Sequence, residues 1–421
     1  MSLQGPMIVV AEQPATDLVE ALRAAGAFPI VETKWADAPT AFVAVKPVAI
    51  VLAEPGPPPS EAAGRMLCLQ VATVNGPMVP VIARVERDMG AAVPIALATD
   101  ANLPVERMIA RLRGALRVRA LHATVLRRID SFAALGGRIV RLPFSDALED
   151  ATVLIAGRGR LYPALSVAIG ERIGIVGALS VGTAAKHLDS RDIDGIVIGD
   201  GFSAPMVEAF LTLLGQDPRF RDIPVAIAAD VPKELGERLP NVDHIDADPT
   251  RIVERMIPLV RLHAFEARLK RVLKSLDAEG MYDPDTCLLT RDAFWHDLGK
   301  VVEDAAERGG ALCVAKFSFD APFDRRVSVD GARLLSRLTR NIDFACLDDD
   351  GTILAAFTQT DLRNAHVVAR RIASVLKHTM LAPHRELAKA TANVTLASFK
   401  AGDTLDTLML RVLGSRAVAA E

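Results

Sequence analysis

Short, wholly apolar segments alternate with amphipathic helical segments in the first third of the chain, and this alternation limits the folds open to it. The apolar segments have the length of strands: Met7–Val10, Val48–Leu52, Met78–Ala83 and Val93–Leu97. Between the first two, Leu18 and Leu22 recur at helical spacing, and Gly26 ends that predicted helix. A strand that is apolar on both faces is buried on both, as in a parallel sheet with helices on either side.

The same order of segments recurs after residue 150. Apolar runs of strand length follow one another again: Thr152–Ala156, Ile173–Val176, Gly195–Gly199, Val225–Ala229 and Val242–Ile245. A long helix is predicted from about Thr250 to Leu276. Because order and strand composition match the first part, we infer an internal duplication, with the Gly- and Pro-containing segment Leu135–Asp150 as its boundary. The sequence predicts two doubly wound α/β units in tandem, at residues 1–134 and 150–278.

Residues 280–421 mix strands and helices in a different order. Phe344–Leu347 and Thr352–Phe357 are apolar runs on either side of Asp350-Gly351. An Asp-Gly pair between apolar runs is the strongest short pattern for a hairpin, and here it predicts a two-residue turn. Other predicted elements surround this hairpin: helices at Arg291–Val302, Gly331–Thr339, Leu362–Lys377 and Leu405–Leu413, and strands at Leu312–Phe319 and Asn393–Phe399. We expect an α+β domain around an antiparallel sheet.

The composition excludes several classes of protein. A net charge of -3 over 421 residues argues against a large nucleic-acid-binding surface. The cysteines are scattered, with no pair at metal-ligand spacing, so we expect free cytoplasmic thiols and no metal site at Cys68, Cys287, Cys313 and Cys346. The longest apolar run, Ala36–Ala53, contains Asp37, Lys46 and Pro47, so we predict no membrane insertion.

The opening of the third segment resembles a known family. Residues 283 to 294 read Asp-Pro-Asp-Thr-Cys-Leu-Leu-Thr-Arg-Asp-Ala-Phe, similar to the Asp-Pro-Leu-Thr-Gly-Leu-Pro-Asn-Arg-Arg-x-Phe that opens GGDEF domains. With two doubly wound units before it, the chain resembles a PleD-type response regulator, in which a receiver, a receiver-like adaptor and a GGDEF domain follow one another. The resemblance implies two tandem flavodoxin-like (CheY-like) receiver domains and, at 280–421, an α+β GGDEF (cyclase-like) domain with a central antiparallel sheet.

The residues that would make such a domain a diguanylate cyclase are replaced. The family's Gly-Gly-Asp/Glu-Glu-Phe falls on Asp349, Asp350, Gly351, Thr352 and Ile353. Glycines let the backbone approach GTP, whereas two carboxylates at those positions fill the space and repel a triphosphate. A further metal-binding aspartate of the family falls on Ser318. Because phosphoryl transfer depends on the metal, the resemblance implies neither bound magnesium nor enzymatic activity.

The acidic residues around this turn leave an alternative open. Asp320, Asp348, Asp349 and Asp350 are enough carboxylates for a displaced metal site. A solvated acidic turn explains the same residues, and we favour it.

A second site of the family is preserved. Active members carry an inhibitory site for their product, cyclic di-GMP, made of an Arg-x-x-Asp five residues before the signature and an arginine in the next helix. Arg340 and Asp343 match the first part, and Arg371 matches the second. A guanidinium can fork onto guanine O6 and N7 or clamp a phosphate, and a carboxylate can accept from guanine N–H groups. The alternative is a solvated ion pair at a helix end; we favour ligand binding because three residues match together.

A receiver that is switched by phosphorylation needs an acceptor aspartate after its third strand. That position falls on Ala53 in the first unit and on Gly199 in the second. Asp200 follows one residue late, without the family's magnesium ligands or lysine, so we interpret it as a turn residue. Glu54 has the charge to mimic a phosphorylated aspartate, but a solvated loop carboxylate explains it equally. We expect neither unit to be phosphorylated and assign both to dimerisation and partner docking.

These patterns favour a non-catalytic cyclic di-GMP receptor/effector without a cofactor. A polar receptor of the same layout exists in this family. The resemblance implies a cytoplasmic homodimer at a cell pole that acts in cell-cycle control through an adaptor or a protease-linked regulator. Two alternatives stay open. A ligand-independent dimeric scaffold predicts that Arg340→Ala changes no partner interaction, and a residual diguanylate cyclase or GTP-binding module predicts magnesium-dependent GTP binding.

Overall fold

The structure is a computed structural model that describes residues 3–53, 61–83, 96–98, 103–136, 142, 145–220, 222–232, 234–236, 239–276, 281–319, 325–378 and 392–414. The chain divides into two compact units. The first, here called the C-terminal unit, comprises Met1–Gly5, Ala123–Leu142 and Arg271–Glu421. The other, the double-sheet unit, comprises Pro6–His122 and Pro143–Lys270. The boundaries of these units differ from the three predicted sequence ranges because two long helices contribute to both.

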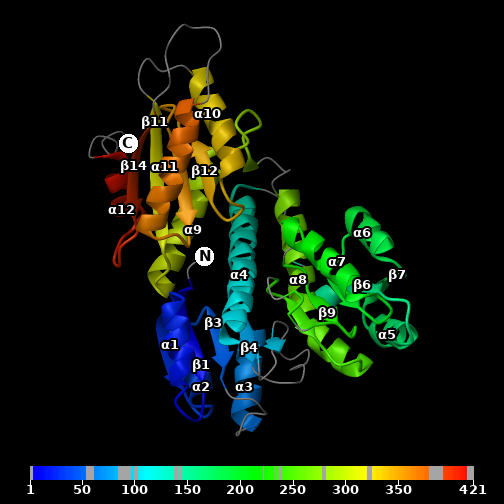
Figure 1. The fold of residues 1–421 in the computed structure, drawn as a ribbon. Helices are drawn as coiled ribbons and strands as arrows, with labels where there is room; N and C mark the ends of the chain where they lie inside the picture. The colour runs from blue at the N-terminus through cyan, green and yellow to red at the C-terminus, as the bar shows by residue number, and fades with distance from the viewer. Residues whose placement is uncertain are drawn as a thin grey trace. The chain divides into compact units, whose positions relative to one another are not determined.

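The double-sheet unit contains two five-stranded sheets in its described part (Figure 1). The strands of the first are β1 (Gln4–Val10), β2 (Phe28–Thr33), β3 (Ala49–Leu52), β4 (Val81–Ala83) and β5 (Ala96–Ala98). They lie in the order β2-β1-β3-β4-β5, and β3 pairs in parallel with both β1 and β4. The helices of this part are α1 (Thr16–Ala24), α2 (Ala38–Val45), α3 (Glu61–Ala72) and α4 (Val105–Ala134).

The second sheet repeats this topology. Its strands are β6 (Thr152–Ala156), β7 (Gly174–Ala178), β8 (Gly195–Ile198), β9 (Val225–Ile227) and β10 (Val242–His244), in the order β10-β9-β8-β6-β7. All four neighbouring pairs are parallel. Counted along the chain, both sheets have the order 2-1-3-4-5 of a flavodoxin-like doubly wound sheet. The helices are α5 (Leu161–Gly170), α6 (Val181–Ser190), α7 (Ala204–Gln216) and α8 (Pro249–Leu276).

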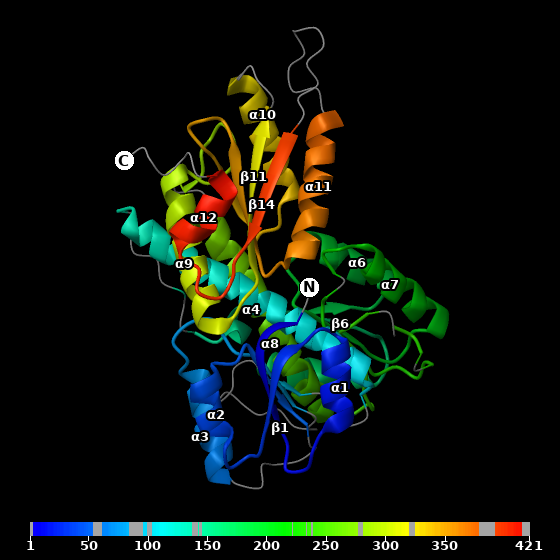
Figure 2. The ribbon, with the colours of Figure 1, turned by 90° about the vertical axis from the view of Figure 1, so that its left-hand side faces the viewer.

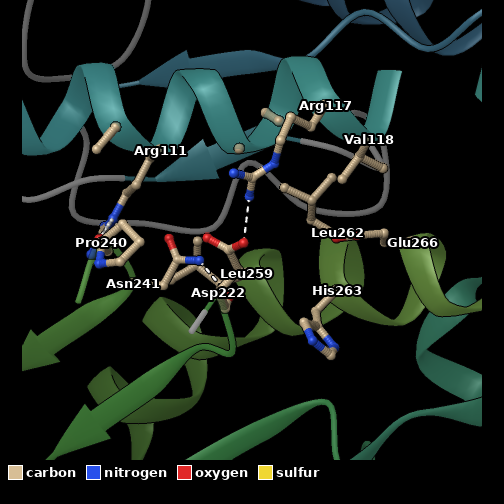
Figure 3. A pocket seen from close by; sticks show the side chains of 13 residues that line it. Arg111, Arg117, Val118, Asp222, Pro240, Asn241, Leu259, Leu262, His263 and Glu266 are labelled. Atoms are coloured by element: carbon tan, nitrogen blue, oxygen red, sulfur yellow. Dashed lines mark hydrogen bonds and ion pairs between the residues drawn. The ribbon is translucent and has the colours of Figure 1, made fainter. Parts of the chain in front are cut away.

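Arginines of α4 bind the edge of this second sheet. The described residues between β9 and β10 form turns and bends. Arg111 forms a salt bridge of 2.6 Å with Asp243, and Arg117 forms one of 2.6 Å with Asp222. Figure 3 shows Arg111 reaching from α4 toward Pro240, whose carbonyl accepts from its Nε at 3.2 Å, and Arg117 reaching toward Asp222. The cavity beside them measures about 30 Å³, room for roughly one or two water molecules, so it is too small for an organic ligand.

The C-terminal unit is built on a four-stranded antiparallel sheet of order β12-β13-β11-β14. Its strands are β11 (Leu312–Phe319), β12 (Phe344–Leu347), β13 (Ile353–Thr358) and β14 (Ala392–Ser398). Its helices are α9 (Arg291–Arg308), α10 (Arg325–Leu338), α11 (Leu362–His378) and α12 (Leu405–Leu413). In β11, Cys313 and Val314 face opposite sides of the sheet, as alternating side chains in a strand must.

Helices cover both faces of this sheet (Figure 2). Helices α9 and α12 pack on the face that contains Val314, together with the end of α4 through Phe132. Helices α10 and α11 pack on the face that contains Cys313. The sheet is therefore the middle layer of three, and the end of α4 belongs to its core.

A buried carboxylate fixes the end of α4 in the C-terminal unit. Asp297 lies on the apolar side of α9 and is 0% exposed. Its Oδ1 accepts a hydrogen bond from the Ser131 hydroxyl, and its Oδ2 lies 3.1 Å from Nε of Arg128 and 3.5 Å from Nε of Arg127. A buried charge is tolerated only when it is paired and hydrogen-bonded, so α9 and α4 each supply what the other requires.

We expect Asp297→Asn to lower the free energy of unfolding of the C-terminal unit by about 3–5 kcal/mol, because two guanidinium groups then stay buried without a carboxylate. Urea unfolding followed by the fluorescence of Trp295, in a Trp35→Phe background, reports on this unit alone. Asp130→Asn, at an exposed carboxylate of α4, is the matched control, and a loss no larger than the control's would contradict this account.

Candidate functional site

Arg340 and Asp343 lie in a tight turn between α10 and β12. The Asp343 N–H donates to the Arg340 carbonyl at 3.0 Å, which closes the turn. Asp343 Oδ1 accepts from the Thr358 N–H at 3.0 Å, and the Thr358 hydroxyl donates to the Ile342 carbonyl at 2.9 Å. These bonds attach the turn to the end of β13. Asp343 is therefore no member of a solvated helix-end ion pair, and its role in the turn is partly structural.

Burial changes the acidity of Asp343. The residue is 9% exposed, and desolvation raises the pKa of its carboxyl to about 6. The Thr358 N–H and the positive charge of Arg340 act in the opposite direction, since each favours the carboxylate. The second oxygen, Oδ2, accepts no hydrogen bond from any described residue. Oδ2 is therefore available to accept a hydrogen bond from a ligand, which would replace the water lost when Asp343 was buried.

Arg340 and Arg371 are both exposed, and within the described chain neither guanidinium forms a salt bridge or a hydrogen bond. Arg371 lies nine residues after the first residue of α11, roughly 13 Å along the helix. Ala369 and Ile372 point into the core, which leaves Arg371 on the outer side. Because α10 and α11 cover the same sheet face, the helix that carries Arg371 lies in the same layer as the helix that ends just before Arg340. The structure joins Arg340 to Asp343 in one turn, but no contact joins Arg371 to either.

The turn between β12 and β13 is longer than the predicted two residues. Leu347 pairs with Ile353, and the Asp348 N–H donates to the Thr352 carbonyl at 2.8 Å. The Gly351 N–H donates back to the Asp348 carbonyl at 2.9 Å, and Gly351 has φ of +78°. The loop between the paired residues Asp348 and Thr352 therefore has three residues, and its last, Gly351, is in the left-handed region, where glycine is favoured. The predicted two-residue turn is wrong because the Asp-Gly pattern does not distinguish these two loop lengths.

Two basic side chains form ion pairs with the three carboxylates of the acidic turn. Arg291 lies 2.8 Å from Asp348 and 3.2 Å from Asp349. Lys316 of β11 lies 3.6 Å from Asp350, which also accepts from the Thr352 hydroxyl at 2.6 Å. The turn is thus an ion-paired cluster. Asp320, the remaining residue of the proposed displaced metal site, lies outside the described residues, and the described ones contain no group of three or more metal-ligating side chains suited to an ion.

The segment that precedes α9 explains the position of Arg291. The Leu289 N–H donates to the Ala345 carbonyl at 2.9 Å, and Leu289 bridges Cys346 in parallel. Counting two residues onward from each bridge partner brings Arg291 beside Asp348. Cys287 of the same segment has a φ of +57°, in the left-handed region that residues other than glycine seldom adopt.

The remaining predicted site residues that the structure describes lie in strands or at strand ends and form backbone pairing or hydrogen bonds there. Ser318 lies on β11 and pairs with Asn393, and Ile353 begins β13 as a buried residue. Ala53 follows β3, and its N–H donates to the Val10 carbonyl at 3.0 Å. The Gly199 N–H donates to the Ala156 carbonyl at 2.8 Å. Glu54 lies outside the described residues.

Asp200 binds the start of a helix. Its carboxylate oxygens accept from the Arg160 N–H at 2.9 Å and from the Leu161 N–H at 3.2 Å, at the N-terminus of α5. A carboxylate is stabilised there by N–H groups that have no partner within the helix. A Cβ at Gly159 would lie 2.1 Å from this carboxyl group, so the close approach requires glycine. The interpretation of Asp200 as a structural turn residue agrees with these contacts.

The sequence patterns did not identify the Arg127, Arg128 and Asp297 cluster. The position of Asp297 on the apolar side of a helix could have indicated this cluster, since a buried carboxylate requires a buried partner. Among the described helices none combines the length and the apolar composition that crossing a bilayer requires.

Comparisons with known proteins add the following. No family model and no curated protein matches the sequence. Among solved structures, the coiled coil and GGDEF domain of DgcB from Caulobacter crescentus with c-di-GMP is 20% identical and has a TM-score of 0.30, over 35% of this chain and 83% of that one. The diguanylate cyclase SiaD with its activator SiaC from Pseudomonas aeruginosa is 21% identical, TM-score 0.31, over 35% and 60%. PelD from P. aeruginosa PAO1 with c-di-GMP is 20% identical, TM-score 0.25, over 40% and 56%.

The raised pKa of Asp343 predicts a pH-dependent contribution to stability. In the folded state the Asp343 carboxyl keeps its proton up to a pH of about 6, whereas in the unfolded chain it releases the proton near pH 3.8. The protonated carboxyl therefore contributes fully to stability below pH 3.8, and this contribution is lost as the pH rises to about 6. We expect the stability of the wild type relative to Asp343→Asn to fall by about 3 kcal/mol over this range. Urea unfolding of the C-terminal unit at several pH values measures it. A constant difference between the two proteins would contradict the burial of a titrating carboxyl.

Proposed function

We propose that the chain is a non-catalytic receptor for cyclic di-GMP, which binds at Arg340, Asp343 and Arg371 and signals through protein–protein interaction. The observation that carries this proposal is the turn between α10 and β12. It holds a buried carboxyl with one free oxygen next to an exposed guanidinium without an ion partner in the described chain. A solvated guanidinium and a partly desolvated carboxyl are complementary to the edge of a guanine base.

The chemistry assigns a role to each residue. The carboxylate of Asp343 accepts from guanine N1–H and the exocyclic amine through Oδ2, because Oδ1 already accepts from Thr358. The guanidinium of Arg340 donates to O6 and N7 in a forked geometry. Arg371 supplies a second cation for the phosphates of the dianionic ligand. Since no contact joins Arg371 to the turn, the dinucleotide itself would link the two parts of the site.

The β12–β13 turn supports a receptor over an enzyme. In a cyclase the corresponding turn lies against GTP and helps hold its metal. Here Asp349 and Asp350 fill the positions of the glycines, and they form ion pairs with Arg291, which Asp348 shares, and with Lys316. A triphosphate would have to displace these ion pairs and then approach two carboxylates, which is electrostatically unfavourable.

The double-sheet unit fits a role in partner binding. Both sheets have the strand order of receivers, while the acceptor positions hold Ala53 and Gly199, and Asp200 binds a helix terminus. We assign both parts to protein contacts, as degenerate receiver domains of a homodimer. The layout is similar to that of the polar receptor PopA. That similarity is the basis for proposing an adaptor or protease-linked partner and a cytoplasmic site of action at a cell pole.

Calorimetric titration of cyclic di-GMP into the full chain tests the proposal. We expect 1:1 or 2:1 binding by the wild type and a loss of affinity of about tenfold or more in Arg340→Ala and in Arg371→Ala, because each removes charge-assisted hydrogen bonds. Arg370→Ala is the matched control, since it removes the same charge from the adjacent exposed position on α11. We expect it to change the affinity by about twofold at most.

Absence of binding by the wild type would reject the receptor and favour a ligand-independent scaffold. Equal losses in Arg370→Ala and Arg371→Ala would show attraction to a general positive surface, without a defined third residue in the site.

A second measurement concerns catalysis. Incubation of the full chain with GTP and Mg²⁺ should yield neither cyclic di-GMP nor pyrophosphate, because the turn places carboxylates where a cyclase has glycines. An active GGDEF cyclase under the same conditions is the positive control. Turnover that disappears in Arg291→Ala would instead assign catalytic use to the ion-paired turn.

A further inference from the structure

The residue after Asp343 connects the proposed site to helix α4. The Phe344 ring is 4% exposed and lies beneath two guanidinium groups of α4. Cζ of Arg127 is 5.1 Å from the ring centroid, and Cζ of Arg128 is 5.7 Å from it. These distances are those of cation–π contacts. Because Phe344 follows Asp343 directly in the chain, a change in the backbone of the turn moves this ring.

The two arginines form a cluster with surplus positive charge. Both side chains are almost completely buried, at 6% exposed for Arg127 and 2% for Arg128, and they share the single carboxylate of Asp297. Desolvation lowers the pKa of Arg127, and the charge of Arg128 lowers it further, while the charges of Asp297 and, to a smaller extent, Asp304 raise it. Both guanidinium groups also have buried N–H groups without an acceptor in the described chain.

The aromatic ring compensates for part of this missing charge. A π face attracts a cation more strongly when both are desolvated, and here the negative face of Phe344 is the neighbour of both guanidinium groups. Tyr282 supplies a second ring, 5.6 Å from Arg128. The position of the end of α4 therefore depends in part on where the Phe344 ring lies. In the described chain Asp297 is the carboxylate in ion-pair contact with both arginines, and the charge of Asp304 acts on Arg127 without such a contact.

The same helix is attached at its other end to the double-sheet unit. Helix α4 is continuous from Val105 to Ala134, and its residues up to His122 belong to that unit. Arg111 donates to the Pro240 carbonyl at 3.2 Å and binds Asp243. A continuous helix with charged attachments near both ends transmits a displacement of one end along its length.

We infer that α4 transmits occupancy of the Arg340–Asp343 turn to the double-sheet unit, with the contact of Phe344 with Arg127 and Arg128 as the coupling element. The inference rests on the proposed cyclic di-GMP site and names the regulation of that site. Ligand contacts at Asp343 and Arg340 shift the turn, the ring moves with it, and the arginine cluster repacks against Asp297. The ligand biases this arrangement only by binding its two states with different affinity.

Hydrogen–deuterium exchange of the full chain, with and without saturating cyclic di-GMP, tests the coupling. In the wild type we expect ligand to change the exchange rate of peptides from residues 105–122 by about fivefold or more. Arg127→Met should still bind ligand but lose this change. It removes the surplus charge and leaves Asp297 paired with Arg128 one to one, so the fold is retained.

A second variant and a control make the outcomes separable. Phe344→Leu keeps every charge and removes the ring, and it should also uncouple the peptides from ligand. Asp130→Asn, at an exposed site on the same helix, should behave as the wild type. Ligand binding without a change at 105–122, or a change that persists in both uncoupling variants, would overturn the coupling and leave the receptor intact. A wild type that does not bind cyclic di-GMP in calorimetry would overturn both.

Discussion

The carboxylate of Asp297 is the interaction on which the arrangement of the C-terminal unit depends. It is fully buried on α9, and its partners Ser131, Arg127 and Arg128 all come from α4, more than 160 positions earlier in the chain. A buried carboxylate with fewer partners would be too costly to keep ionised. This requirement places the last three turns of α4 in a core otherwise built from residues after Arg271. The compact units consequently do not follow the order of the sequence.

The elements that the sequence predicts best are those with uninterrupted apolar patterns. The predicted helix at Leu405–Leu413 and the predicted strand at Thr152–Ala156 have the observed bounds. Parallel sheets are present in both predicted α/β ranges and an antiparallel one in the third. A run of apolar residues that must be buried on both faces fits few structures other than a strand, so its bounds are well predicted. Helix α10 begins at Arg325, six residues before its predicted start, because its polar first turn lacks the apolar residues at helical spacing on which the prediction depends.

The pairing of charges could not be predicted from the sequence. Asp297 follows Ala293 and Phe294 at helical spacing, so its position on an apolar face is visible, but several arginines along the chain could have been its partner. The same holds for Arg291, whose contact with Asp348 follows from a parallel bridge between segments more than 50 residues apart. Local patterns identify a residue that requires a partner, and only the fold identifies which residue that partner is.

The proposed site differs from these clusters in what it leaves unpaired. Asp348, Asp349 and Asp350 each lie within 4 Å of Arg291 or Lys316, so the carboxylates of this turn already have internal ion partners. Arg340 and Arg371 have kept exposed guanidinium groups, which cost little while water solvates them and can exchange that water for a dianion. Asp343 is the opposite case, because its burial already opposes ionisation and a guanine N–H donor would relieve that cost. A ligand that contributes donors to Asp343 and phosphates to the arginines satisfies the carboxyl and the guanidinium groups at once. A simple anion would satisfy only the arginines, and a neutral base would satisfy only Asp343.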